Sequence, residues 1–148
     1  DSIKTLAEYY GIKYNNSTDY ELLKRYARGV EGGWISPNSD FSNYCRLYFR
    51  VQNEIVGETT SNGIIITGQS RHFMHRVLGT KEDPITKRSR SGVEIDDIKN
   101  ALQNGVPRKI KEEKQKDGSM KKSQKFVTDK CDVSVNPETG MLIQCNPR

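Results

Sequence analysis

The segment CDVSVNPETGMLIQC, residues 131–145, carries the clearest strand pattern in the chain. Apolar and polar residues alternate on both sides of a turn at residues 136–140, which predicts a β-hairpin. With the turn centred on Glu138, the odd-numbered residues of both strands share one face, which should pack on a helix. Its two cysteines would lie opposite each other. A disulfide and a pair of buried thiols are the alternatives, and the thiols are favoured. The predicted face holds Cys131, Val133, Val135, Met141, Ile143 and Cys145.

Two basic segments precede this hairpin. RKIKEE (108–113) and KSQKFVT (122–128) flank a loop that contains an Asp-Gly pair, and both are predicted to be strands. Residues 107–125 hold eight Lys or Arg and three acidic residues, so their net charge of 8 − 3 = +5 equals that of the whole chain. If Phe126 packs inward, Ser123 and Lys125 point outward together. A hydroxyl beside a lysine on a sheet face can hold a phosphate.

The rest of the chain is predicted to be mainly helical. GQSRHFMHRVLGT (68–80) predicts a short helix with Ser70 as its cap and Gly79 as its end. Three helices are expected within residues 1–56, a short strand at residues 64–67 and a polar, basic loop at residues 80–92. EIDDIKNALQNG (94–105) predicts a helix whose core face holds Ile95, Ile98, Ala101 and Leu102.

Both histidines of the chain, His72 and His75, lie on the helix predicted after Ser70. At about 100° per residue, they fall with Arg76 on the face opposite the apolar residues, so we expect both to be exposed. A solvated helix face is the ordinary interpretation of such a pair. Arg71 and Arg76, however, create a positive field that attracts phosphate and favours neutral imidazole. The N-terminal end of a helix also favours anions.

These residue types match one kind of chemistry. Cleavage of RNA without a metal ion needs a base for the ribose 2′-OH, an acid for the leaving 5′-oxygen, and cations that hold the charge on the phosphate. No HExxH motif, carboxylate cluster or Cys/His ligand spacing predicts a metal site, and no P-loop, dinucleotide-binding or G-x-S-x-G motif occurs. We therefore expect neither a metal nor a cofactor. The three cysteines, without a CxxC pair, favour a reduced working state.

The chain resembles a known group of toxins in four pieces that follow in order. They are a Ser-x-His on a short helix (GIIITGQSRHFMHRVLGT, 63–80) and a G-V-x-x-x-D-I-x-x-A-L helix (RSGVEIDDIKNALQNG, 90–105). A G…S-x-K strand and a V-x-x-N-P-x-T-G-x-x-I hairpin follow (SQKFVTDKCDVSVNPETGMLIQCNPR, 123–148). This pattern is similar to C-terminal toxin domains of bacterial polymorphic and contact-dependent toxins and of phage head-associated proteins. These domains belong to the barnase–EndoU–colicin–RelE group of metal-independent ribonucleases. The sequence departs from the pattern at Glu94, where related chains often have a capping serine.

The resemblance implies an α+β fold in which helices pack on a small antiparallel sheet of about four strands. It covers roughly Gly63 to Arg148, so that residues 61–148 would be the toxin domain and residues 1–60 an N-terminal helical extension. It implies endoribonuclease activity that leaves a 2′,3′-cyclic phosphate, with tRNA as the expected substrate. The implied catalytic residues are His72, Ser123, Lys125 and Thr139. His75 is not part of the pattern, and we expect it to contact RNA together with Arg71, Arg76, Arg88, Arg90 and Lys111.

The expected partners are RNA and a cognate immunity protein, which a strongly basic site predicts to be acidic. We expect a monomer that is delivered or secreted by bacteria as part of a longer protein and acts in the cytoplasm of a target cell. No apolar run approaches the roughly 20 residues of a membrane span. Two alternatives remain: a non-catalytic nucleic-acid-binding module, and a structural module of a phage or secreted protein.

Overall fold

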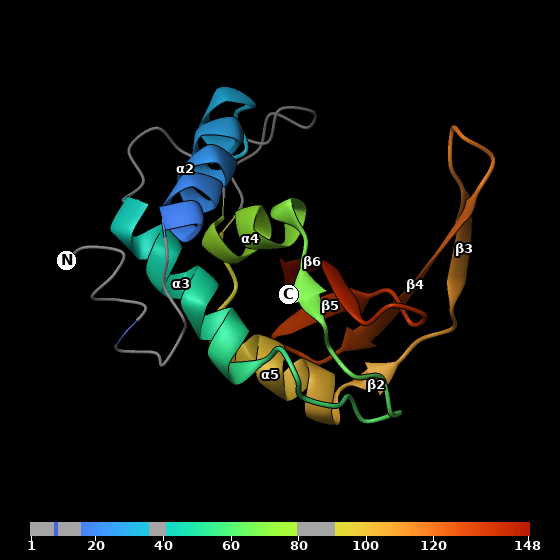
Figure 1. The fold of residues 1–148 in the computed structure, drawn as a ribbon. Helices are drawn as coiled ribbons and strands as arrows, with labels where there is room; N and C mark the ends of the chain where they lie inside the picture. Colours follow the sequence, from blue (N-terminus) through green and yellow to red (C-terminus); the bar gives the residue numbers. More distant parts are fainter. Residues whose placement is uncertain (1–7, 9–15, 36–40, 80–90) are drawn as a thin grey trace.

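In the computed structural model, the described residues are 8, 16–35, 41–79 and 91–148. They form an α+β fold with helices at one end and strands at the other (Figure 1). None of the helices described is both long and apolar enough to cross a membrane. The helices are α2 (Asn16–Glu31), α3 (Phe41–Glu54), α4 (Arg71–Leu78) and α5 (Ile95–Asn104). The strands are β1 (Gly68–Gln69), β2 (Val106–Pro107), β3 (Lys111–Lys114), β4 (Met120–Val127), β5 (Cys131–Val135) and β6 (Met141–Pro147).

The sheet differs from the expected set of about four antiparallel strands. Within the described residues it has six strands in the order β1-β6-β5-β4-β2, and β3 also pairs with β4. The sheet is mixed because β1 runs parallel to β6, while the other pairs are antiparallel. The two strands that the sequence does not predict, β1 and β2, have two residues each. Such short pairings leave too little periodicity to be recognised.

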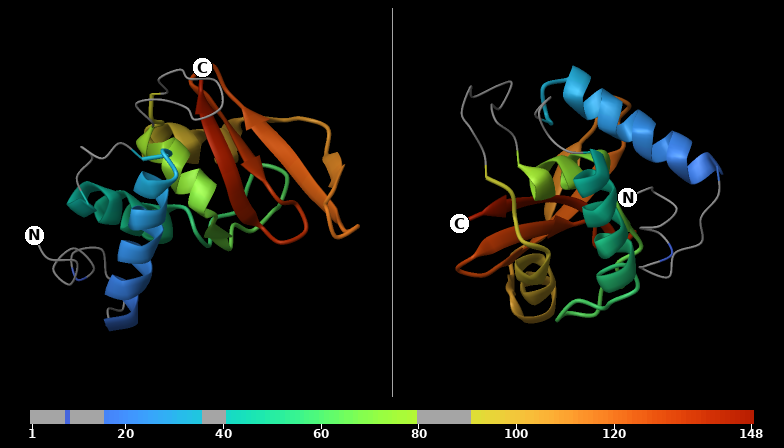
Figure 2. Two further views of the ribbon diagram at one scale, coloured as in Figure 1. Left: turned by 90° about the horizontal axis from the view of Figure 1, so that it is seen from above. Right: turned by 90° about the vertical axis from the view of Figure 1, so that its left-hand side faces the viewer.

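One apolar core joins the helices to the sheet. It includes Tyr44 and Phe49 from α3, Phe73 from α4 and Phe126 from β4, each of them at most 1% exposed. The four predicted core residues of α5 are also buried, which confirms the interpretation of that helix. Helix α4 packs on β6 and α5 on β5, while α3 contacts both helices (Figure 2). The N-terminal helices therefore share the core of the C-terminal segment.

The predicted facing of the C-terminal hairpin is correct for β5 and wrong for most of β6. A β-bulge shifts the register, so that Val135 pairs with Leu142 and Ser134 pairs with Gln144. Leu142 consequently enters the core, whereas Met141 is 38% exposed. An extra residue in one strand reverses the alternation beyond it.

This register also changes which residues lie opposite the two cysteines of the hairpin. Cys131 lies opposite Pro147, and Cys145 lies opposite Val133, so the two cysteines do not face each other. Both are buried and neither is in a disulfide. The preference for two buried thiols is confirmed, although their predicted pairing is wrong.

Other predicted elements either lie at somewhat different residues or fall outside the described residues. The strand expected at residues 64–67 is one isolated bridge between Thr59 and Ile65, and the paired strand β1 begins at Gly68. The helices expected for the second and third N-terminal segments are confirmed as α2 and α3. Most of the first expected helix and of the basic loop, including Arg88 and Arg90, lies outside the described residues.

Candidate active site

Helix α4 carries His72 in its first turn, and Ser70 fixes where that turn begins. The Ser70 hydroxyl oxygen accepts a hydrogen bond from the Phe73 N–H at 3.1 Å, as the predicted cap should. The same hydroxyl donates to the carbonyl oxygen of Ile143 at 2.8 Å. Gly79 ends the helix with φ of 82°, a conformation that favours glycine. Ser70 therefore both starts α4 and ties it to β6.

Strand β4 supplies the opposing wall. Phe126 is fully buried, so alternation turns Ser123 and Lys125 toward the other face of the sheet, as predicted. Cross-strand pairing then places Lys111 of β3 opposite Ser123, and Ser134 of β5 opposite Lys125. Directly opposite residues of antiparallel strands point to the same face, so these four side chains gather on one surface.

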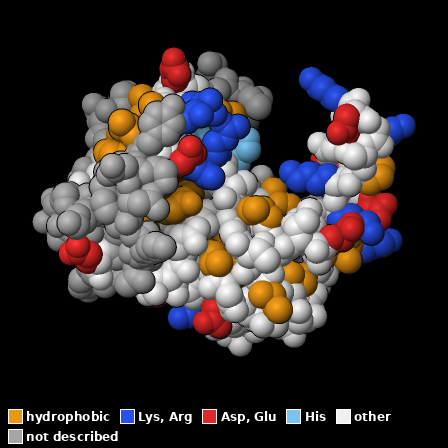
Figure 3. All heavy atoms as spheres, in the orientation of Figure 1, with side chains coloured by type: hydrophobic (Ala, Val, Ile, Leu, Met, Phe, Trp, Pro, Cys, Tyr) orange, Lys and Arg blue, Asp and Glu red, His pale blue; other side chains and the backbone are white. Residues whose placement is uncertain are grey.

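Together these elements enclose a cleft of about 340 Å³, which we call the His72 cleft. The β3–β4 hairpin stands away from the body, and the hollow between them has Lys or Arg side chains on both sides and a histidine on the body side (Figure 3). Three of the four predicted catalytic residues and one predicted RNA-binding residue line it. Its full lining is His72, Lys111, Glu113, Lys121, Ser123, Lys125, Ser134, Ile143 and Gln144.

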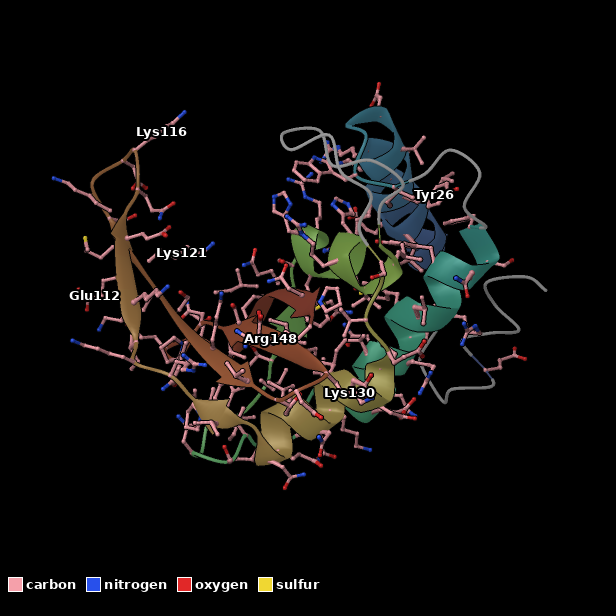
Figure 4. All side chains as sticks on the ribbon, turned by 180° about the vertical axis from the view of Figure 1, so that it is seen from behind. Tyr26, Glu112, Lys116, Lys121, Lys130 and Arg148 are labelled. Atoms are coloured by element: carbon pink, nitrogen blue, oxygen red, sulfur yellow. The ribbon has the colours of Figure 1, made fainter. Side chains whose placement is uncertain are left out.

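The electrostatics of the cleft favour neutral His72. Partial burial lowers the pKa of His72 below its ordinary value, and the nearby charges of Arg71, Arg76 and Lys121 lower it further. Lys121 extends from β4 across the hollow toward α4 (Figure 4). A neutral imidazole at the edge of a lysine-lined cleft can accept a proton close to a bound phosphate.

His75 is not exposed, and this prediction from the helical projection is wrong. The side chain is 5% exposed because Trp34, from the end of the α2 segment, stacks on it with 6.4 Å between ring centroids and 8° between ring planes. Neither ring nitrogen has a hydrogen-bond partner among the described residues. Burial, followed by the charges of His72, Arg71 and Arg76, lowers the pKa of His75 to about 4. This histidine is therefore a buried neutral ring and does not reach the cleft.

The predicted RNA-binding arginines of α4 lie near the cleft without lining it. Arg71 is exposed and borders a separate hollow between α2 and the start of α4. The guanidinium of Arg76 lies over the Trp34 ring, 5.8 Å from its centroid. Both charges act on His72, but neither arginine is part of the lining that holds Ser123.

Thr139 also lies away from the predicted site. It is exposed in the turn between β5 and β6, where its hydroxyl oxygen accepts a hydrogen bond from the Met141 N–H at 3.3 Å. Its carbonyl oxygen accepts from the Thr67 hydroxyl at 2.8 Å. Thr139 does not line the His72 cleft and instead holds the turn against the segment before β1.

No family model matches the sequence, and comparison with curated proteins and with solved structures likewise gives no match. The site must therefore be judged by its own residues. In the part of the chain that the structure describes, no group of three or more His, Cys, Asp or Glu side chains is placed to hold a metal ion.

Several residues of the cleft were not predicted from the sequence. Lys121 lies two residues before Ser123 on the same strand face, so strand alternation alone could have identified it. Ser134 and Gln144 lie on the outward face that the alternation of the hairpin predicts, so they too could have been identified, whereas Ile143 reaches the cleft only because of the bulge. A basic group on α2 was missed because this helix was assigned to an extension. Its members, Lys24, Arg25 and Arg28, line the hollow beside Arg71.

Proposed function

We propose that the chain is a metal-independent endoribonuclease whose active site is the His72 cleft. The observation that carries the proposal is the convergence of His72 with Ser123 and Lys125, about fifty residues later, in one hollow that Lys111 and Lys121 also line. The depressed pKa of His72 suits a general base at neutral pH. The lysines suit a phosphodiester, whose negative charge increases on the non-bridging oxygens as the reaction proceeds.

In the proposed reaction, neutral His72 takes the proton of a ribose 2′-OH, and the 2′-oxygen attacks the adjacent phosphorus. The bond from phosphorus to the 5′-oxygen of the next nucleotide breaks, which leaves a 2′,3′-cyclic phosphate. The departing oxygen takes a proton from one of the lysine ammonium groups of the cleft. Lys125 and the Ser123 hydroxyl hold the non-bridging oxygens.

The wider biological setting is part of the same proposal and rests on the sequence resemblance. The domain would be a toxin of the barnase–EndoU–colicin–RelE group, carried at the end of a longer bacterial protein and acting on RNA, tRNA in particular, in a target cell. Its basic cleft suits inhibition by an acidic immunity protein. The alternative of a non-catalytic nucleic-acid-binding module rests on the same lysines and predicts RNA that is bound but remains intact.

The test is incubation of the purified chain with total RNA and a defined oligonucleotide in EDTA. We expect cleavage products that end in a 2′,3′-cyclic phosphate. His72→Ala should lower the rate by about 10²–10⁴-fold, and Lys125→Ala by about 10²-fold, because they remove the base and one phosphate contact. A single 2′-deoxy substitution at the cleavage position should block the reaction by removing the nucleophile.

Lys116→Ala is the matched control because Lys116 lies at the tip of the β3–β4 hairpin (Figure 4) and does not line the cleft. It should retain nearly full activity. His72 is exposed, so His72→Ala should also retain the melting temperature. Binding without cleavage would contradict the proposed reaction and favour the binding module. Cleavage that persists in both His72→Ala and Lys125→Ala would place the active site elsewhere.

A further inference from the structure

A second hollow adjoins the His72 cleft on the same face of the sheet. It measures about 530 Å³ and shares Lys111, Ser123 and Lys125 with the cleft, so a ligand can pass from one hollow to the other along β4. We call it the Arg108 groove. Its lining is Arg108, Lys109, Ile110, Lys111, Ser123, Lys125, Val127 and Arg148.

The charge of the Arg108 groove has one sign. Five of its eight lining residues are Lys or Arg, and no carboxylate is part of the lining. The neighbouring carboxylate of Asp132 is already engaged, since it accepts hydrogen bonds from Arg148 Nε and Asn146 Nδ2, both at 3.1 Å. This ion pair neutralises Arg148, and the four other cations of the lining, Arg108, Lys109, Lys111 and Lys125, suit a ligand with more than one negative charge.

The groove is also partly apolar. Ile110 is 44% exposed among these cations, and the half-buried Val127 lines the same hollow. A free phosphate would make no use of this surface. A nucleotide would use both parts, because its phosphate meets the cations while the face of its base covers the apolar side chains.

The backbone of the groove is held in place before any ligand binds. The Arg108 N–H donates to the Lys125 carbonyl oxygen at 2.8 Å, and the Arg108 carbonyl oxygen accepts from Gln124 Nε2 at 2.8 Å. The Gln124 side chain in turn accepts from Asn62 Nδ2 at 3.0 Å. A site that is ordered in advance costs less conformational entropy on binding.

We propose that the Arg108 groove is a second nucleotide subsite of a single RNA strand. Arg108 and Lys109 bind the phosphate next to the scissile one, and the base of that nucleotide packs against Ile110 and Val127. The position relative to a scissile phosphate rests on the proposed function, whereas the binding of a strand does not. The chain then recognises at least two successive nucleotides, and the energy of the second contact accelerates cleavage at the first.

The kinetic test compares a dinucleotide with tetranucleotides extended on the 5′ side or on the 3′ side. Wild-type kcat/KM should increase at least tenfold for one of the two extensions. The double variant Arg108→Glu/Lys109→Glu should lose this gain, so that the ratio of kcat/KM between the extended substrate and the dinucleotide falls to about one. The control double variant Lys114→Glu/Lys116→Glu makes the same charge change at hairpin residues outside both hollows, and it should retain the gain.

A binding test separates this inference from the proposed function. The probe is a fluorescent, 2′-O-methylated hexanucleotide, which cannot be cleaved by 2′-OH attack, and the readout is anisotropy at several salt concentrations. The Arg108→Glu/Lys109→Glu variant should raise Kd at least tenfold above the control variant and reduce the salt slope by about one to two. Ile110→Ser should raise Kd with an unchanged slope, because it removes no charge.

The outcomes are distinguishable. Arg108-dependent binding by a chain that cleaves no RNA would overturn the proposed function and keep the groove as a strand-binding site. If the Arg108→Glu/Lys109→Glu variant cleaved RNA with the same gain from substrate extension as the control variant, the proposed subsite would be wrong. The proposed endoribonuclease activity would then still stand. An unchanged melting temperature for each variant, expected at these exposed positions, ensures that the comparison concerns binding.

Discussion

Two imidazoles three residues apart on α4 differ in what covers them. The ring of His72 is exposed and borders a lysine-lined cleft, while the ring of His75 is buried beneath Trp34. The rings of His72 and His75 lie edge to face at 5.8 Å, close enough for the charge of one to oppose protonation of the other. Their different surroundings give one histidine access to substrate and leave the other as a structural ring.

Lys121→Gln should raise the pKa of His72, because the positive charge of Lys121 opposes protonation of the imidazole. A higher pKa leaves less neutral base at a given acidic pH. The acidic limb of the kcat/KM profile should therefore move to higher pH. The measurements are the pH–rate profile and the NMR titration of the His72 ring.

Lys116→Gln makes the same charge change at the hairpin tip and should leave both curves in place (Figure 4). An identical His72 titration in Lys121→Gln and wild type would contradict the inference that the charge of Lys121 lowers the pKa of His72.

His75 should make the fold sensitive to mild acid. Its pKa is about 4 in the folded chain and about 6.5 when unfolded, so between these values only the unfolded chain binds the proton. Stability is therefore fully present above pH 6.5 and decreases as the pH falls toward 4, by about 3 kcal/mol in total. His75→Phe keeps a ring of similar shape without the titration. The difference in unfolding free energy between pH 7.5 and pH 5, from urea denaturation, should be smaller in this variant, and an equal difference would contradict the assignment.

Local chemistry made some individual residues predictable and not others. The Ser70 cap and the outward direction of Ser123 and Lys125 follow from rules that act within a few residues. The burial of His75 does not, because its cover comes from Trp34, about forty positions earlier in the chain. The helical projection correctly identified the face of α4 but could not show that a second helix covers it.

At the level of elements, α2 and α4 approach closely at Gly29. A Cβ added there would overlap the Ile35 side chain and lie 2.9 Å from His75 Nε2. The carbonyl oxygen of Gly29 also accepts hydrogen bonds from the N–H groups of Trp34 and Ile35, at 2.9 and 3.0 Å. The missing side chain thus lets the α2 segment place Trp34 over His75.

Gly29→Ala should therefore destabilise the chain by about 1–3 kcal/mol through overpacking. At an ordinary helix position the same change stabilises by about 1 kcal/mol, so the sign is diagnostic. Trp34 is the only tryptophan in the sequence, and its emission should shift to the red as the contact opens. Ala27→Gly, at an exposed position of the same helix, should lower stability without this shift. Stabilisation by Gly29→Ala would show that the helices can separate without cost.

The helices and the two longer hairpins were predictable because each carries several turns or alternations of its own. The error arose where one residue altered a pattern: the bulge in β6 brought Leu142 into the core and turned Ile143, predicted to face the core, toward the cleft. Ile143, a residue of the cleft lining, was assigned to the core for this reason. The sequence identifies strands from alternation, but it does not mark where an extra residue interrupts the pairing.

At the scale of the whole molecule, the buried apolar residues of the described segments form one cluster, with members on both sides of residue 60. Tyr44, Phe49, Val51 and Ile55 belong to it together with residues of the sheet and of α5. The boundary predicted at residue 60 passes through this cluster. A chain of residues 61–148 would lose these contacts and expose the partners that they cover.

We expect that truncated chain to lack a cooperative unfolding transition in calorimetry and to bind a dye specific for exposed apolar surface. The control replaces residues 113–121, all of them exposed, with an Asn-Gly turn that shortens the β3–β4 hairpin. Its thermal transition should stay cooperative and near that of the full chain. A sharp transition in residues 61–148 alone would show instead that the N-terminal helices are a separable extension.

The order of charges along β3 has a consequence for how the chain behaves at high concentration. Strand β3 is paired to β4 on one side, and all four of its residues, Lys-Glu-Glu-Lys, are exposed. A bare strand edge invites another chain to add its own strand, and charged side chains discourage this addition because they would have to be desolvated or brought close to like charges. The hairpin that forms one wall of the cleft can therefore extend into solvent without promoting aggregation.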